Sequence, residues 1–216
     1  MKIKLNNKKS KIMTINFTKN HQFSTRVMMN KELLEIVEET TILGLILTKD
    51  LTWRRNTENL VRKANTRMII LRNLIQFPIS REDLVLIYCQ YIRVILEFNS
   101  NVWFSSITDD ESEDIERVQK NACRLILKGE YSDYKSALET LKLDNMKERR
   151  VYLAKRFAKK CTKLDEMKDL FKPTSNKQHE IRNIEKVEVK FAAKSRLYNS
   201  TVPTLQRMMN AEPGPQ

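Results

Sequence analysis

The spacing of apolar residues changes along the chain, and the change separates a strand-like beginning from a helical remainder. Residues 11–17 alternate between apolar and polar side chains, and two further short apolar runs follow at 33–37 and 41–47. Alternation with a period of two residues is typical of a strand that has one buried face. We therefore predict about three strands at the beginning of the chain, ended by a turn near residue 50.

Beyond residue 53 the apolar residues are spaced by three and four positions, as they are along one side of a helix. The first such seam predicts a helix over 57–76, which Pro78 ends because proline cannot continue a helix. The seam consists of Val61, Ala64, Met68, Leu71 and Ile75. The opposite side of this helix is polar and consists of Arg55, Asn59, Arg62, Thr66 and Asn73, with Lys63 beside them.

Further helices are predicted from capping residues. Ser80 begins a helix that runs to residue 98 and is apolar nearly all round, which is typical of a helix buried in a core. Asn99 follows it, and asparagine readily adopts the left-handed conformation that ends helices. Later helices are expected from Thr108 to Gly129, over 132–141, from Asp144 to 162, over 180–198 and over 203–210.

These elements predict a mainly α protein with a small N-terminal β segment. Three glycines and five prolines among 216 residues are few turn formers, which favours long helices over many short strands. We divide the chain into a β segment at 1–52, a first helix at 53–78, a helical domain at 79–171, and a linker with a weakly ordered basic tail at 172–216.

The charge of the chain indicates a polyanionic partner. Forty Lys and Arg residues exceed 27 Asp and Glu residues, and the net charge of +13 favours nucleic acid, with a solvated basic surface as the alternative. Three widely spaced cysteines fit neither a disulfide framework nor a zinc module, and we predict no metal site and no cofactor. Without a signal-like start or an apolar run long enough to cross a bilayer, we expect an intracellular protein that has no membrane partner.

Blocks of residues along the chain form an ordered series that points to a family. The first blocks are Leu5-Asn6 with Lys9-Ser10-Lys11, and Leu43-Gly44 with Asp50-Leu51-Thr52-Trp53. The next are Tyr91-Ile92-Arg93 with Leu96-Glu97-Phe98 and Val102-Trp103, and Glu116-Arg117-Val118-Gln119-Lys120 with Ala122 and Arg124. The last are Tyr134-Lys135-Ser136-Ala137-Leu138, Glu148-Arg149-Arg150, and Asn199-Ser200 with Pro203 and Gln206-Arg207. In this order they resemble the end of the palm, the thumb and the following helices of a jockey-like non-LTR retrotransposon reverse transcriptase.

The resemblance implies a part of an RNA-directed DNA polymerase that lacks catalysis of its own. In that family polymerisation depends on palm aspartates, the last pair in an aromatic-Ala-Asp-Asp box, which we expect upstream of this chain. Two-metal phosphoryl transfer needs carboxylates that hold both cations, and residues 1–50 supply no such pair. Asp109-Asp110 has Ile107 where the aromatic residue belongs, and acidic residues in the first turn of a helix are explained by the helix dipole.

The same resemblance implies that segment 1–52 is the end of the palm and 53–78 the thumb helix, which would hold RNA or an RNA/DNA duplex. The residues predicted to contact nucleic acid are Arg55, Arg62, Lys63, Arg67, Arg149 and Arg150. A second basic cluster between Lys147 and Lys160 is a further candidate. Two alternatives remain open: a basic helical RNA-binding or adapter protein, domesticated or unrelated, and a helical protein-interaction module. The oligomeric state is left open.

Overall fold

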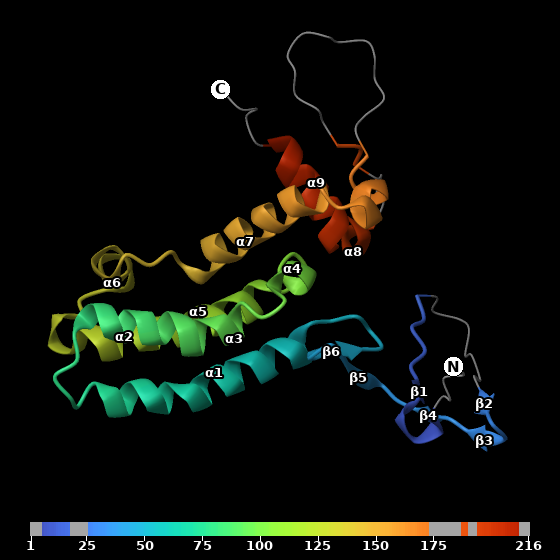
Figure 1. Ribbon diagram of the computed structural model, residues 1–216, viewed down its shortest axis with the longest axis horizontal. Coiled ribbons are helices and arrows are strands. Elements are labelled where there is room, and N and C mark those ends of the chain that lie inside the picture. The colour runs from blue at the N-terminus through green and yellow to red at the C-terminus, as the bar shows by residue number, and fades with distance from the viewer. Residues whose placement is uncertain (1–5, 18–25, 173–186, 190–193, 212–216) are drawn as a thin grey trace, which may run out of the picture. The chain divides into compact units, whose positions relative to one another are not determined.

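The computed structural model describes residues 6–17, 26–172, 187–189 and 194–211 (Figure 1). The chain forms two compact units, Met1–Asn59 and Leu60–Gln216, and the boundary between them falls inside helix α1 (Arg54–Leu74). Short strands lie near the beginning and helices make up most of the remainder, so the predicted mainly α class is confirmed.

The first unit contains short strands that pair two by two. In the part of this unit that the structure describes, a 3-10 turn, η1 (Asn7–Lys9), comes first. The strands after it are β1 (Lys11–Ile12), β2 (Met28–Met29), β3 (Glu32–Leu33), β4 (Glu35–Ile36), β5 (Glu39–Ile42) and β6 (Leu45–Thr48). Strands β1 and β4 are parallel, with Lys11 opposite Glu35, whereas β2 pairs with β3 and β5 with β6 in antiparallel fashion. The predicted strand at 11–17 is therefore limited to two residues, and the one at 33–37 is divided between β3 and β4.

The prediction of one strand over 41–47 is wrong, because this run folds back on itself as a hairpin. Leu43 and Gly44 have φ angles of 49° and 84°, and they form the two-residue turn between β5 and β6. Two successive residues with positive φ are typical of the type I′ turn, whose twist matches that of the paired strands. A glycine inside an apolar run is the sequence signal for this turn.

The turn after β6 leads the chain into α1 and is built around Asp50. Thr48 donates its hydroxyl to Asp50 Oδ1 at 2.5 Å, and the backbone N–H of Thr52 donates to the same oxygen at 3.2 Å. The Thr48 hydroxyl and the Thr52 N–H lower the pKa of the Asp50 carboxyl. Leu51, inside the turn, has a φ of 55°, which these bonds to Asp50 hold in place.

The second unit consists of helices. After α1 they are α2 (Arg81–Ile87), the π-helical segment η2 (Tyr88–Arg93), α3 (Val94–Leu96), α4 (Ser100–Trp103), α5 (Asp109–Leu127), η3 (Lys128–Glu130), α6 (Tyr134–Leu141), α7 (Met146–Cys161), η4 (Asp165–Leu170), α8 (Ser195–Tyr198) and α9 (Thr201–Ala211). Figure 1 shows α2, α3 and α5 as a middle layer, with the part of α1 that belongs to this unit on one side and α7 on the other.

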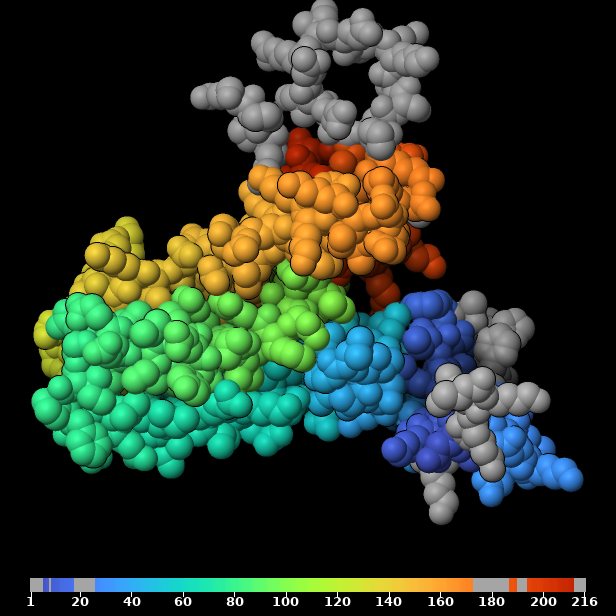
Figure 2. Space-filling model, viewed as in Figure 1, coloured from blue at the N-terminus to red at the C-terminus, as the bar shows by residue number. Residues whose placement is uncertain are grey.

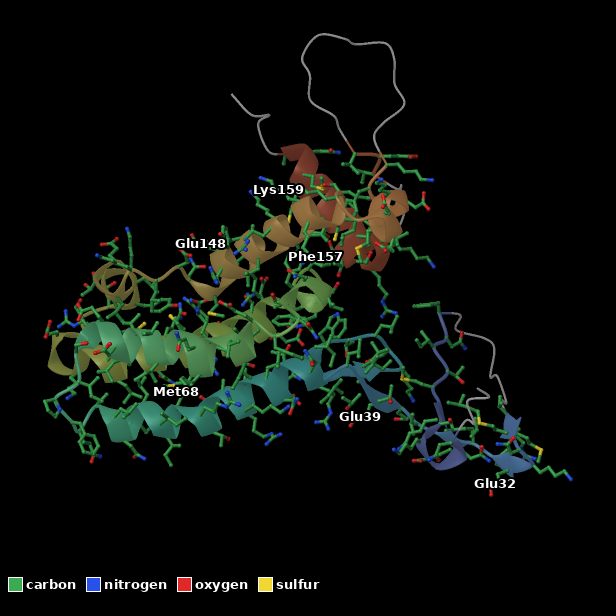
Figure 3. The ribbon with its side chains drawn as sticks, viewed as in Figure 1. Glu32, Glu39, Met68, Glu148, Phe157 and Lys159 are labelled. Atoms are coloured by element: carbon green, nitrogen blue, oxygen red, sulfur yellow. The ribbon has the colours of Figure 1, made fainter. Side chains whose placement is uncertain are left out.

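Helix α1 packs one apolar side against the middle layer. Leu60, Ala64, Met68 and Leu71 are each at most 2% exposed, and Figure 3 shows Met68 between α1 and the helices above it. The predicted seam is confirmed in its centre. At its start it is displaced by one residue, because Leu60 rather than Val61 is buried.

The helical stretch from Ser80 to Asn99 begins and ends as predicted, but its apolar side chains are not buried on all sides. Ser80 accepts a hydrogen bond from the Asp83 N–H as the N-cap, and Asn99 is left-handed with φ 48° and ψ 29°. The prediction that this helix is buried all round is wrong for its outer side, where apolar side chains are exposed. They are Leu86, Tyr91, Val94 and Phe98. Burial on one side is enough to fix a helix, and apolar atoms are common on protein surfaces.

The caps of the next helices agree with the sequence to within one residue. Thr108 and Glu111 form a complete capping box at the start of α5. At the end of α5 the positive φ, 51°, belongs to Lys128 rather than to the predicted Gly129. Asn145 rather than the predicted Asp144 caps α7, because its side chain accepts the Glu148 N–H at 2.8 Å.

A buried amide side chain connects four segments of the second unit. Gln119 of α5 accepts the hydroxyl of Tyr88 at 2.8 Å through Oε1. Its Nε2 donates to the Tyr134 hydroxyl at 3.0 Å and to the Asp144 carbonyl at 2.9 Å. Gln119 and Tyr88 are both fully buried, and burial raises the pKa of Tyr88, which keeps its hydroxyl a donor.

Glu116, one turn earlier on α5, extends this network to the start of α7. Its carboxylate accepts the Tyr134 hydroxyl, and both of its oxygens accept the Met146 N–H at 3.0 Å. A carboxylate beside the first N–H groups of a helix is stabilised by the helix dipole. The position of α7 is therefore set by α5.

A second apolar cluster lies where α7 ends. Its buried members are Ala154, Ala158, Cys161, Phe171, Val187 and Leu205. Helix α9 packs on α7 here, which confirms the predicted helix at 203–210. The predicted helix over 180–198 falls mostly outside the described residues. The three cysteines are free, and burial raises the pKa of Cys123 to about 12.

Replacing Gln119 with alanine tests the internal network. The Tyr88 hydroxyl would lose its acceptor inside the core, and we expect the free energy of unfolding to fall by about 2–4 kcal/mol. Urea denaturation followed by circular dichroism measures this. The control is Gln90→Ala, which removes an exposed glutamine and should change stability by less than about 0.5 kcal/mol. Equal losses for the two variants would contradict the role assigned to Gln119.

Candidate nucleic-acid interface

Positive charge in the helical part of the chain is concentrated on two helices. Helix α1 carries six Lys and Arg residues against one acid, and α7 carries seven against one. Helix α5 has the opposite balance, with six acids against three basic residues. Because α5 belongs to the layer between α1 and α7, the second unit has two separate basic surfaces.

The first basic surface lies on the part of α1 that belongs to the second unit. Arg62, Lys63, Arg67 and Arg72 are all exposed. Arg67 donates through Nη1 to the Tyr91 carbonyl at 3.0 Å, which fixes its guanidinium against η2. Apolar side chains bury the other side of α1, so these cations project from a helix that is held in place.

Arg55 lies in the first unit, where acids surround it. Its guanidinium pairs with Glu39 at 3.1 Å and with Glu58 at 3.4 Å, and the hydrogen bond to Glu39 is the main cause of its raised pKa. Both partners reduce the charge that Arg55 presents to a phosphate. The prediction of nucleic-acid contact therefore has less support for Arg55 than for Lys63.

The two predicted contacts on α7 are engaged inside the protein. Arg149 donates through Nε to Glu97 at 2.9 Å, and its side chain is 23% exposed. Arg150 is 3% exposed and donates to the Ser112 hydroxyl at 2.6 Å, and burial lowers its pKa. Arg150 is thus removed from the candidate surface: at 100° per residue it falls on the buried side of α7, together with Ala154 and Ala158.

The exposed side of α7 contains Arg156, which lies within the predicted basic cluster, and Tyr152, which the sequence prediction did not single out. Both side chains are exposed, and Figure 2 shows α7, in yellow to orange, at the surface. The Arg149 and Arg156 guanidiniums lie 5.4 Å and 5.8 Å from the centre of the Tyr152 ring. Their spacing, three residues before and four after the tyrosine, is a signal that the sequence already contained.

Two observations bear on other kinds of site. Among the residues that the structure describes, no three His, Cys, Asp or Glu side chains gather as metal ligands would, and Asp109 and Asp110 are exposed in the first turn of α5. No helix within the described ranges is both long and apolar enough to cross a membrane.

Comparisons with protein-family models, with curated proteins and with solved structures find no match to this chain. The candidate interface therefore rests on its own geometry and charge.

Replacing Arg150 with alanine should affect stability and not binding. The lost hydrogen bond to Ser112 and the lost packing should lower the free energy of unfolding by about 1.5–3 kcal/mol. The slope of log K against log salt for nucleic acid should stay unchanged, because a buried guanidinium contacts no phosphate. Lys147→Ala, at an exposed position of the same helix, should leave stability unaltered. A reduced slope for a folded Arg150→Ala protein would return Arg150 to the interface.

Proposed function

We propose that this chain is the carboxy-terminal part of a non-LTR retrotransposon reverse transcriptase, comprising the end of the palm, the thumb and the helices after it. In this proposal it holds the template–primer duplex and has no polymerase activity by itself. The ordered blocks of sequence described above support the family, and the structure offers a surface that suits the task.

The observation that carries the proposal is the exposed basic side of α1 in the second unit. Arg62, Lys63 and Arg72 project there, and the opposite side of the helix is buried. Exposed cations on a fixed helix can contact the phosphates of a duplex, and release of counterions then supplies affinity that is independent of sequence. Lys63 and Arg72 make no ion pair among the described residues, so their charge is available to a phosphate.

Removing two charges from this surface tests the proposal. In the variant Arg62→Gln with Lys63→Gln, both side chains are exposed and neither belongs to the core, so folding should be retained. We expect weaker binding to an RNA/DNA hybrid duplex and a salt slope that is smaller by up to about 1.8, which corresponds to two phosphate contacts. Fluorescence anisotropy of a labelled duplex, titrated with the full chain at several salt concentrations, measures both quantities.

The matched control removes two charges elsewhere. Lys135 and Lys142 are exposed at the two ends of α6, and replacing both with glutamine changes the net charge by the same amount. This control should bind almost as the original chain does. If both double variants behave alike, the effect is one of net charge, and α1 is not the interface.

A complete lack of salt-dependent binding would reject the proposal. It would favour the alternative of a helical protein-interaction module, because the exposed apolar side chains of Leu86, Val94 and Phe98 offer such a module a contact surface.

The proposal also predicts that the purified chain does not extend a primer. Polymerisation requires carboxylates that hold two metal ions, and those of this family belong to a box of palm residues that this sequence does not contain. The assay is primer extension on an RNA template with Mg²⁺ or Mn²⁺. Templated extension that copurifies with the chain would contradict this prediction.

A further inference from the structure

The outer side of α7 carries an aromatic ring between two guanidinium groups. Tyr152 is 48% exposed, with Arg149 at 5.4 Å and Arg156 at 5.8 Å from its ring centre. Most exposed tyrosines have no reason to be held in one orientation. Here contacts between cations and the ring favour a defined position on the helix.

The two arginines differ in how firmly they are held. Arg149 is tied to Glu97, whose side chain is 15% exposed, so this flank of the ring is anchored to the middle layer. Arg156 is exposed and forms no ion pair with any described residue. A planar ligand that displaces Arg156 from the ring can therefore lie between the Tyr152 ring and the Arg156 guanidinium.

Basic residues continue along the same helix toward its end. Lys159 and Lys160 are exposed one turn beyond Arg156, and Figure 3 shows Lys159 near the end of α7 and Glu148 near its start. Glu148 is the one acid of α7 and lies one turn before Tyr152. The charge along the helix thus becomes more positive from the ring toward the C-terminal end.

We propose that the outer side of α7 binds an unpaired nucleic-acid strand, with a base stacked on Tyr152 and the next phosphates at Arg156 and Lys160. Every base has a π face, and stacking on an aromatic side chain beside cations is a general means of binding single strands. Bases inside a duplex are already stacked, so the ring favours an unpaired strand. The inference rests on the proposed function and extends it, because α7 and the duplex surface on α1 lie on different sides of the middle layer.

The test uses the full chain and two labelled oligonucleotides, an oligouridylate and an oligothymidylate, each with a 2-aminopurine in its centre. Tyr152→Ala should weaken binding at least about fivefold and abolish the fluorescence quenching that stacking causes. Tyr152→Phe keeps a ring of the same size, and its affinity should stay within about twofold. The two oligonucleotides distinguish an RNA strand from a DNA strand.

Charge variants and a second tyrosine complete the design. Replacing Arg156 and Lys160 with glutamine should reduce the salt slope for the single strand by up to about 1.4, and Glu148→Gln should strengthen binding. The control Tyr91→Ala removes a tyrosine that is 51% exposed and lies on η2, and it should change neither affinity nor quenching. Binding of the hybrid duplex should respond to the α1 variants and stay unchanged in Tyr152→Ala.

Unchanged single-strand affinity and quenching in a folded Tyr152→Ala protein would overturn this inference, as would an equal loss in Tyr91→Ala. Either result could occur while the α1 variants still weaken duplex binding, and the proposed function would then stand without it. If neither surface binds nucleic acid, both proposals fail together.

Discussion

The arrangement of the second unit depends on two polar side chains of α5, of which Gln119 is fully buried and Glu116 is partly buried. Gln119 satisfies hydrogen-bonding groups from η2, α6 and the loop before α7, and Glu116 accepts the first backbone N–H of α7. A buried polar group that loses its partner is costly, so every segment bonded to this pair must keep its place. The orientation of α7, and with it the direction in which Tyr152 points, follows from this constraint.

Several residues of the sequence blocks described above form bonds inside the second unit. Glu97, Glu116, Gln119 and Arg149 belong to those blocks, and each is bonded to another residue of the same unit. Their side chains connect segments of this unit to one another. These four residues thus act within the protein, whereas Arg62 and Tyr152, which the two proposals above use, lie between the blocks.

Local signals in the sequence were sufficient to predict part of the fold. A helix cap depends on a few adjacent residues, so Ser80, Thr108 and Asn99 could be recognised directly. The hairpin turn at Leu43 and Gly44 was not predicted because apolar residues continue on both sides of the single glycine and resemble one strand. The π-helical segment η2 buries Tyr88 and Ile92, and no local pattern in the sequence predicted its π-helical form.

The candidate site was less predictable than the fold, for a physical reason. Cationic residues at successive positions of a helix point in different directions, and the sequence does not say which of them meet acids or the core. Arg149 and Arg150 are neighbours in a basic run, but one is paired with Glu97 and the other is buried against Ser112. Their exposure is decided by α5 and by the end of α3, both far away along the chain.

The acidic balance of α5 between the basic helices α1 and α7 gives the second unit a quadrupolar distribution of charge. A polyanion that neutralises one outer helix would leave the other helix charged, because a middle layer of helices, each about 10 Å across, exceeds the screening length of physiological salt, about 8 Å. One molecule could then link two nucleic-acid segments and raise their effective concentration toward each other. If the two proposals above hold, this layering sets the stoichiometry of the complexes, one nucleic-acid segment or two for each chain.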